Sequence, residues 1–294
     1  DVRVDLEFGV DFAAVVNASS TSRLPFDFRV EISIVEVGSG RQVASGSSDV
    51  GGGASVVSWS GQQEGVRSSL HKVTWSTTLR GAKLWWPHTF GTPHLHELRV
   101  RVFCGGEAAG DASDAQAVTL GFRSIAVEDD KNLGGPVTLV NGERVFLTGG
   151  NWIAMDQFLR ADPGVARTDY AHHVRLHKRL GLDVIRVWGG GIAEREEFYA
   201  ACDREGMLVW QEFWLTGDNN GRWAGNWSWP DGLDQPSWHG AGFGYPGVTS
   251  DLFVDNARDV LRAVHTHASL GFWCLGNEIA GREGAAWGLQ SRVL

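Results

Sequence analysis

An amide and a carboxylate, Asn277 and Glu278, directly follow the apolar run 270–275, which is typical of a short buried strand. Charged side chains are rarely buried without a partner. The strand therefore either leaves the core at this point, so that both residues are solvated, or it directs them toward a ligand. Burial next to an apolar strand would raise the pKa of Glu278, and a carboxyl group of that kind can act as a general acid and base.

Further polar clusters lie in comparable positions, each directly after an expected strand. They are Asn151–Trp152, Arg186 with Trp188, and Gln211–Glu212. In a (β/α)8 barrel the active site is built at the carboxyl ends of the parallel strands. Hydrogen-bonding or aromatic residues at every one of these strand exits are difficult to explain by solvation, so they favour a ligand-binding role for Glu278.

The aromatic content indicates which ligand these positions would suit. The chain has 14 Trp residues, and many of them lie between residues 152 and 238. Trp presents a flat apolar face with a polar edge, which suits stacking on a sugar ring. Trp152, Trp188 and Trp214 are the candidate stacking residues, with core packing as the alternative. Asp156 could bind sugar hydroxyls or could be a solvated loop carboxylate.

The residues before about 125 predict an all-β domain. Short alternating stretches separated by Gly-, Ser- and Asn-rich turns recur without a helical period, as in a β-sandwich of about 120 residues. The last of these stretches, 115–128, is expected to be one strand. We assign residues 1–128 to an immunoglobulin-like β-sandwich, and an Asn-Gly hairpin turn follows at 140–143.

After that turn the pattern alternates between strands and helices. Strands are expected at 144–152, 183–191, 208–214 and 270–275. Helices are expected from Thr168, as the cap, to about 180, from about 195 to 204, and from Ser250 onward. Glu194, Glu196 and Glu197 would open the second helix, where the helix dipole stabilises them. Short right-handed crossovers between strands in this order predict a parallel sheet, and we assign residues 129–294 to the first half of a (β/α)8 barrel.

The bulk composition excludes several classes of function. Lys and Arg total 26 against 35 Asp and Glu, for a net charge of −9, so no nucleic-acid partner is expected. No apolar run reaches the length of a membrane span, so no membrane partner is expected either. The three Cys and the helical His residues lack ligand spacing. We therefore expect no metal and no cofactor.

Several segments together resemble the glycoside hydrolases of family 2, of the β-mannosidase type. The segments are WWPHTFG…LHELRV (85–100), NGERVFLTGGNW (141–152), IRVWGGGIAEREEFYAACDREGMLVWQEFW (185–214) and FWCLGNE (272–278). The combination is most similar to the plant-type endo-β-mannosidases. The resemblance implies a sandwich followed by a barrel, and it implies an oligosaccharide or glycan substrate, for example the Man-β-1,4-GlcNAc linkage of N-glycans.

The resemblance also implies roles for individual residues. Glu278 matches the acid/base at the end of strand 4, and Asn277 matches the residue that binds the sugar 2-hydroxyl. Arg186 resembles the arginine that keeps the nucleophile ionised, with a surface ion pair as the alternative. The nucleophile itself is a glutamate on strand 7, which we expect to lie beyond residue 294, so residues 1–294 alone are expected to be inactive. Glu212 could be an acid, a ligand contact or a salt-bridge partner, and the position of the family acid favours a supporting role.

Two structural expectations accompany this assignment. Adjacent residues on a regular strand face opposite sides, so Asn277 and Glu278 can both serve one site only if the strand breaks at Gly276. The long loop 215–249 would line subsites beyond the cleaved bond, as in an endo-acting enzyme.

Three alternatives remain open at the level of sequence. The first is an exo-β-mannosidase or an exo-β-glucosaminidase. The second is a carbohydrate-binding protein or inactive pseudoenzyme. The third is a module that binds another protein.

Overall fold

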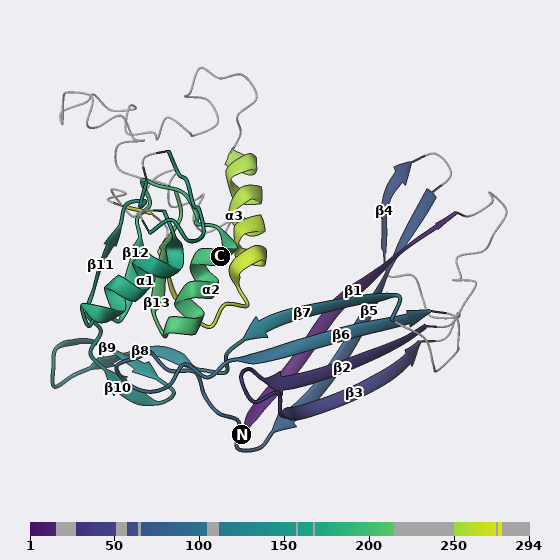
Figure 1. Cartoon of the computed structure of the whole chain (residues 1–294), viewed down its shortest axis with the longest axis horizontal. Coiled ribbons are helices and arrows are strands. Elements are labelled where there is room, and N and C mark those ends of the chain that lie inside the picture. Colours follow the sequence, from purple (N-terminus) through teal and green to yellow (C-terminus); the bar gives the residue numbers. More distant parts are fainter. Residues whose placement is uncertain are drawn as a thin grey trace. The chain divides into compact units, whose positions relative to one another are not determined.

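The computed structural model describes residues 1–15, 28–50, 58–63, 66–104, 112–156, 158–166, 168–214, 250–274 and 276–277. The loop 215–249 and Glu278 lie outside these ranges. The chain forms two compact units (Figure 1). Unit 1 comprises residues 1–83 and 94–122, and unit 2 comprises residues 84–93 and 123–294.

The described residues of unit 1 form two antiparallel sheets. One contains β1 (Val2–Val15), β5 (Val66–Leu79) and β4 (Ser58–Gln63) in that order, and the other contains β3 (Gln42–Val50), β2 (Phe28–Glu36), β6 (His96–Cys104) and β7 (Asp114–Leu120). Val4, Ile34 and Leu79 from β1, β2 and β5 form one buried cluster, so the two sheets share a core. The β-rich character expected of the N-terminal part is confirmed.

One glycine shows how closely the two sheets of unit 1 pack. A Cβ atom added to Gly46 in β3 would lie 2.2 Å from Nε1 of Trp75 in β5. Any side chain at residue 46 would therefore collide with the indole.

The second segment of unit 2, from residue 123, begins with a small antiparallel sheet of β8 (Ile125–Asp130), β9 (Gly135–Val140) and β10 (Glu143–Val145). The expected Asn-Gly turn joins β9 to β10, and Asn141 and Gly142 have positive φ values of 52° and 83°. This backbone matches the right-handed twist of a hairpin. Two expected single strands are divided: 115–128 forms β7 and β8, and 144–152 forms β10 and the parallel strand β11 (Gly149–Trp152). Each divided strand contributes to two different sheets.

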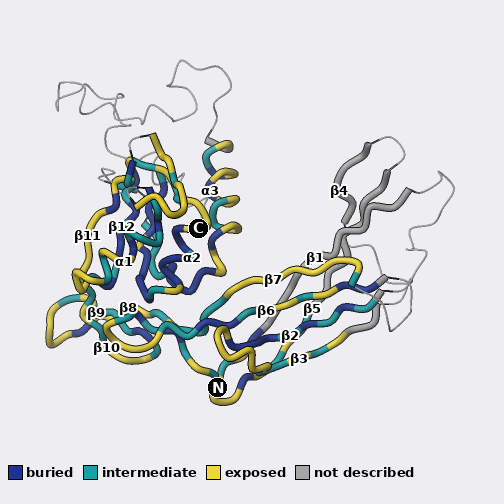
Figure 2. The backbone as a smooth tube through the Cα atoms, in the orientation of Figure 1, coloured by how far each residue is buried: buried dark blue, intermediate teal, exposed yellow. Residues whose placement is uncertain are grey.

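The main sheet of unit 2 contains four parallel strands in sequence order. They are β11, β12 (Val184–Val187), β13 (Leu208–Glu212) and β14 (Leu270–Cys274), linked by α1 (Tyr170–Arg179), α2 (Glu196–Glu205) and α3 (Ser250–Val264). Side chains from β12 and β13, including Ile185, Val187 and Val209, form one buried core with residues of α1, α2 and α3. Figure 2 colours the buried positions along the backbone dark blue. The predicted strand–helix alternation and the parallel sheet are confirmed.

The helix ends follow the expected chemistry with one correction. Gly206 ends α2 with a φ of +69°, as a C-terminal glycine does. Asp169, and not Thr168, caps α1, because its carboxylate accepts the backbone N–H groups of Ala171 and His172. The Thr168 hydroxyl donates to Oδ2 of Asp162 at 3.1 Å.

The segment 84–93 packs with unit 2, near the ends at which the parallel strands begin. Trp85 is fully buried, and its indole donates to the Asp203 carbonyl at 2.8 Å. Nε2 of His88 lies 2.7 Å from the Leu182 carbonyl. These contacts fix one end of the sheet, and the opposite end carries the predicted site. No helix among the described residues is long and apolar enough to cross a membrane.

Candidate active site

The guanidinium of Arg186 in β12 contacts residues at the exits of the other three parallel strands. Its Nη1 donates to Oδ1 of Asn151 at 2.9 Å, and its Nη2 donates to Oδ1 of Asn277 at 2.8 Å. Nε and Nη2 both contact Oε1 of Glu212, at 2.9 and 2.7 Å. Parallel register explains this grouping, because Asn151 pairs with Arg186 across β11 and β12 and Glu212 ends the next strand. We call these four residues the Arg186 cluster.

Glu212 has both carboxylate oxygens occupied. Its side chain is 2% exposed, and its second oxygen, Oε2, accepts the backbone N–H of Gly189 at 2.8 Å. Of the alternatives considered for Glu212, the contacts are those of a salt-bridge partner. The carboxylate fixes the guanidinium and the turn that follows β12, so it serves the site through Arg186.

The backbone leaves regular strand geometry directly before Asn277. β14 ends at Cys274, and Gly276 has a φ of +150°, which is disfavoured for residues with a side chain. The break expected at Gly276 is thereby confirmed. Glu278, the predicted proton carrier, lies outside the described residues, so its role stays a prediction.

Trp152 does not occupy a position suited to stacking on a sugar. It is 5% exposed and packs between Tyr170 of α1 and Phe198 of α2. Asn151 and Trp152 are neighbours on one strand, so they face opposite sides of the sheet. Because Asn151 faces Arg186, Trp152 must face the helices, and core packing accounts for it.

Glu194, which the sequence predicts in the opening turn of the second helix, is instead the acceptor for the Trp152 indole. Oε1 of Glu194 accepts Nε1–H of Trp152 at 2.7 Å, and Oε2 accepts the hydroxyl of Tyr170. Burial and the neighbouring carboxylate raise the pKa of Tyr170. Because α2 begins at Glu196, Glu194 is not part of its first turn, and it anchors the loop after β12 to α1 instead. No spacing signal in the sequence links Glu194 to a residue 42 positions away.

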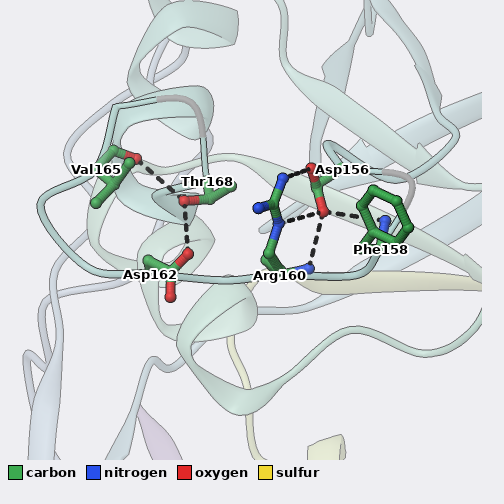
Figure 3. A network of polar contacts seen from close by, with 6 residues as sticks. All are labelled: Asp156, Phe158, Arg160, Asp162, Val165 and Thr168. Carbon is green, nitrogen blue, oxygen red and sulfur yellow. Dashed lines mark hydrogen bonds and ion pairs between the residues drawn. The ribbon is translucent and has the colours of Figure 1, made fainter.

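Asp156 is engaged by its own loop (Figure 3). Its carboxylate forms two bonds with the Arg160 guanidinium, at 3.0 and 2.8 Å, and it also accepts the backbone N–H of Phe158 at 3.0 Å. These hydrogen bonds, chiefly those from the Arg160 side chain, hold the pKa of Asp156 well below its usual range. Neither of the expected roles, a sugar ligand or a solvated carboxylate, describes these contacts.

The remaining Trp candidates lie beside the Arg186 cluster in sequence. Trp188 is half-buried, and a Cβ atom at Gly190 would lie 1.8 Å from its ring, so the indole lies directly on the glycine backbone. Trp214 packs against Phe213 and Phe253, with ring centroids 6.0 and 5.8 Å apart. Both remain candidate sugar contacts.

Metal ligation does not explain the site within the described residues. No group of three or more His, Cys, Asp or Glu side chains in those residues could hold a metal ion. The charges at the described strand exits are those of the Arg186–Glu212 ion pair, and the side-chain amides of Asn151 and Asn277 flank it. Such a site can bind hydroxyl groups and stabilise a carboxylate by hydrogen bonds.

Comparison with known proteins gives a consistent family signal. Residues 9–123 match the model of glycosyl hydrolases family 2. Over 195 residues, 66% of this chain, the sequence is 40% identical to a mannosylglycoprotein endo-beta-mannosidase from Lilium longiflorum, and it covers 18% of that protein. It is 30% identical over 211 residues, 70% of this chain, to beta-mannosidase B from Thermothelomyces thermophilus, of which it covers 21%.

The fold is also found among solved structures. The crystal structure of a beta-D-mannosidase from Dictyoglomus thermophilum matches 99% of this chain and 31% of its own chain, with a TM-score of 0.62 at 21% identity. The chain spans about a fifth of the length of the two curated relatives described above.

Proposed function

The chain carries a domain of glycosyl hydrolases family 2 and is similar to β-mannosidases beyond that domain, and on this basis we propose that it is part of a retaining glycoside hydrolase. The enzyme cleaves β-mannosidic linkages, with Glu278 as the general acid and base. We further propose the Man-β-1,4-GlcNAc linkage of N-glycan oligosaccharides as the substrate. The name of the lily relative supports that choice.

The Arg186 cluster is the observation that carries this proposal. Residues at the exits of β11, β13 and β14 converge on the guanidinium of Arg186 from β12, and Asn277, the residue directly before Glu278, is one of them. The irregular backbone at Gly276 supports a site in which Asn277 and Glu278 both serve the substrate.

The second part of the proposal concerns the fold, in which unit 1 is an immunoglobulin-like sandwich and unit 2 is half of a (β/α)8 barrel. Right-handed crossovers are the rule for parallel strands in sequence order, so α1, α2 and α3 lie on one face of the sheet, where their buried side chains pack with Ile185, Val187 and Val209. The opposite face carries Arg186, Glu212 and the aromatic pair Trp210 and Phe272, whose ring centroids are 6.0 Å apart. Trp210 is 40% exposed. An apolar residue on a sheet face without helices is what the interior of an incomplete barrel predicts.

In the proposed reaction, Glu278 protonates the glycosidic oxygen while a second carboxylate, about 5–5.5 Å away, attacks the anomeric carbon from the opposite face. Cleavage of the C–O bond leaves a covalent glycosyl-enzyme. Glu278 then removes a proton from water, which attacks the same carbon and releases the carboxylate. Asn277 binds the 2-hydroxyl, where contacts strengthen in the transition state.

We propose that the nucleophile is a glutamate outside residues 1–294, held ionised by Arg186. A guanidinium has five N–H donors. One bond from Nε, one from Nη1 and two contacts from Nη2 go to described residues, which leaves one N–H on Nη1 for a further acceptor. A carboxylate at that position would have a lowered pKa.

The experiment that tests this function uses the complete natural protein. Hydrolysis of an aryl β-mannoside, an aryl β-glucosaminide and a Man-GlcNAc₂ oligosaccharide is followed by proton NMR, which also identifies the first anomer released. Release of β-mannose from the mannosides supports the proposal. Faster hydrolysis of the aryl β-glucosaminide than of the mannosides would contradict the proposed mannose specificity. Binding of the sugars without turnover would favour a carbohydrate-binding protein.

A further inference from the structure

The Arg186 cluster orients two side-chain amides, and only one of them has been given a role so far. The oxygens of Asn151 and Asn277 accept hydrogen bonds from Nη1 and Nη2 of one guanidinium. An arginine side chain carries only donors and no acceptor. The amide oxygen of each Asn must therefore face Arg186, and no rotation of the amide satisfies the guanidinium in another way.

This constraint determines where the amide nitrogens point. In each Asn the NH₂ group lies on the other arm of the amide, so it is directed away from the guanidinium. Asn151 is exposed, and Asn277 is partly exposed, at the carboxyl ends of the strands. Glu212 keeps the guanidinium in place because its buried carboxylate binds Nε and Nη2. The donors of both amides are thus fixed before any ligand binds.

We propose that Asn151 is a second substrate-contacting residue, whose amide nitrogen donates to a hydroxyl oxygen of the bound sugar. Asn151 and Asn277 then act as a pair of donors held by Arg186. The chemistry suits adjacent hydroxyl groups on a sugar ring, since each hydroxyl oxygen offers lone pairs to an N–H donor. This inference rests on the proposed function for the identity of the ligand as a β-mannoside.

The substitution Asn151→Asp separates the donor from the acceptor. The aspartate keeps an oxygen for Nη1 of Arg186 but replaces the NH₂ group by a second oxygen, so the donor is lost and a negative charge is added. Asn132→Asp, in the exposed turn between β8 and β9, introduces the same charge away from the Arg186 cluster and serves as the control. All variants are made in the complete protein.

The probes are 4-nitrophenyl 1-thio-β-D-mannoside and its 2-, 3-, 4- and 6-deoxy analogues, whose sulfur linkage resists hydrolysis. Affinities are measured by calorimetry or by ligand-observed NMR. We expect Asn151→Asp to bind the parent thioglycoside about 2- to 12-fold more weakly than the wild type, which corresponds to one neutral hydrogen bond. The loss should vanish with the deoxy analogue that lacks the contacted hydroxyl, while Asn132→Asp binds like the wild type.

Two results would overturn the role of Asn151. One is unchanged affinity in Asn151→Asp, and the other is an equal loss with every deoxy analogue, since a displaced Arg186 would weaken all of them alike. If the wild type does not bind the parent thioglycoside at all, the inference fails as well. Hydrolysis of the ordinary O-linked mannoside by the wild type is measured separately, so failure of the proposed function is distinguished from failure at Asn151.

Discussion

The substitution Glu212→Gln isolates the contact by which the cluster holds the turn after β12. In the wild type, Oε1 binds the Arg186 guanidinium and Oε2 accepts the N–H of Gly189 at 2.8 Å. The glutamine in Glu212→Gln has only one acceptor oxygen. That side-chain oxygen will accept from the Arg186 guanidinium, because the cation is a stronger donor than the backbone N–H of Gly189. The new NH₂ group then faces Gly189, and the N–H of Gly189 loses its partner.

The size of the effect follows from the type of bond that is lost. A hydrogen bond to a charged group contributes about 1.5–3 kcal/mol, and burial prevents water from replacing the carboxylate. At about 1.4 kcal/mol per factor of ten, the amide of Gly189 should exchange its hydrogen about 10- to 150-fold faster. Arg186 keeps its bonds to Asn151 and Asn277, so we expect the sheet itself to remain folded.

Hydrogen–deuterium exchange with mass spectrometry measures this effect in the peptide that contains Gly189. The matched control is Glu205→Gln, which removes the same charge from the ion pair with Lys178 on the helical side. That pair is partly exposed and contributes little, so Glu205→Gln should leave the exchange of Gly189 unchanged. Equal exchange at Gly189 in the wild type and in Glu212→Gln would refute the reasoning about Glu212.

Two further predictions concern the backbone and the pH dependence. Gly276→Ala places a side chain on a backbone with a φ of +150°, at a cost of about 1–3 kcal/mol. The substitution should displace Asn277 and so lower kcat on an aryl β-mannoside. A kcat equal to that of the wild type would argue against the strained turn. Hydrogen bonds, chiefly from Arg41, lower the pKa of Glu36 from 4.5 to about 2. Because this pKa is depressed in the folded state, the stability that Glu36 contributes is present above pH 4.5 and is lost as the pH falls toward 2. The difference between wild type and Glu36→Gln in urea unfolding should therefore shrink over that window, and a constant difference would contradict the assignment.

The sequence was sufficient to find the residues that meet at the strand exits. Parallel strands bring their carboxyl ends to one edge of a sheet, so a polar residue directly after each apolar run predicts a shared location. Arg186, Glu212 and Asn277 are brought together in this way. The break at Gly276 was also predictable, because two neighbouring residues were both required on one face.

Other positions depended on contacts that the sequence does not encode locally. The position of Trp152 after an expected strand favours a ligand contact over core packing, but alternation with Asn151 places it among the helices. The roles of Glu194 and Asp156 were set by Tyr170 and Arg160, partners that no periodic pattern identifies. The strand expected at 144–152 is divided because its first part pairs in a hairpin and its second part pairs in the parallel sheet.

The central claim, that Glu278 is the acid and base of a retaining mannosidase, is tested most directly by Glu278→Ala in the complete protein. We predict that hydrolysis of an aryl β-mannoside with a poor leaving group falls about 10²- to 10⁴-fold. With a dinitrophenyl leaving group, which needs no proton, added azide should restore turnover. The azide attacks the glycosyl-enzyme, and the product is β-mannosyl azide. The account would be contradicted if Glu278→Ala hydrolysed the substrate with the poor leaving group at the wild-type rate and formed no β-mannosyl azide.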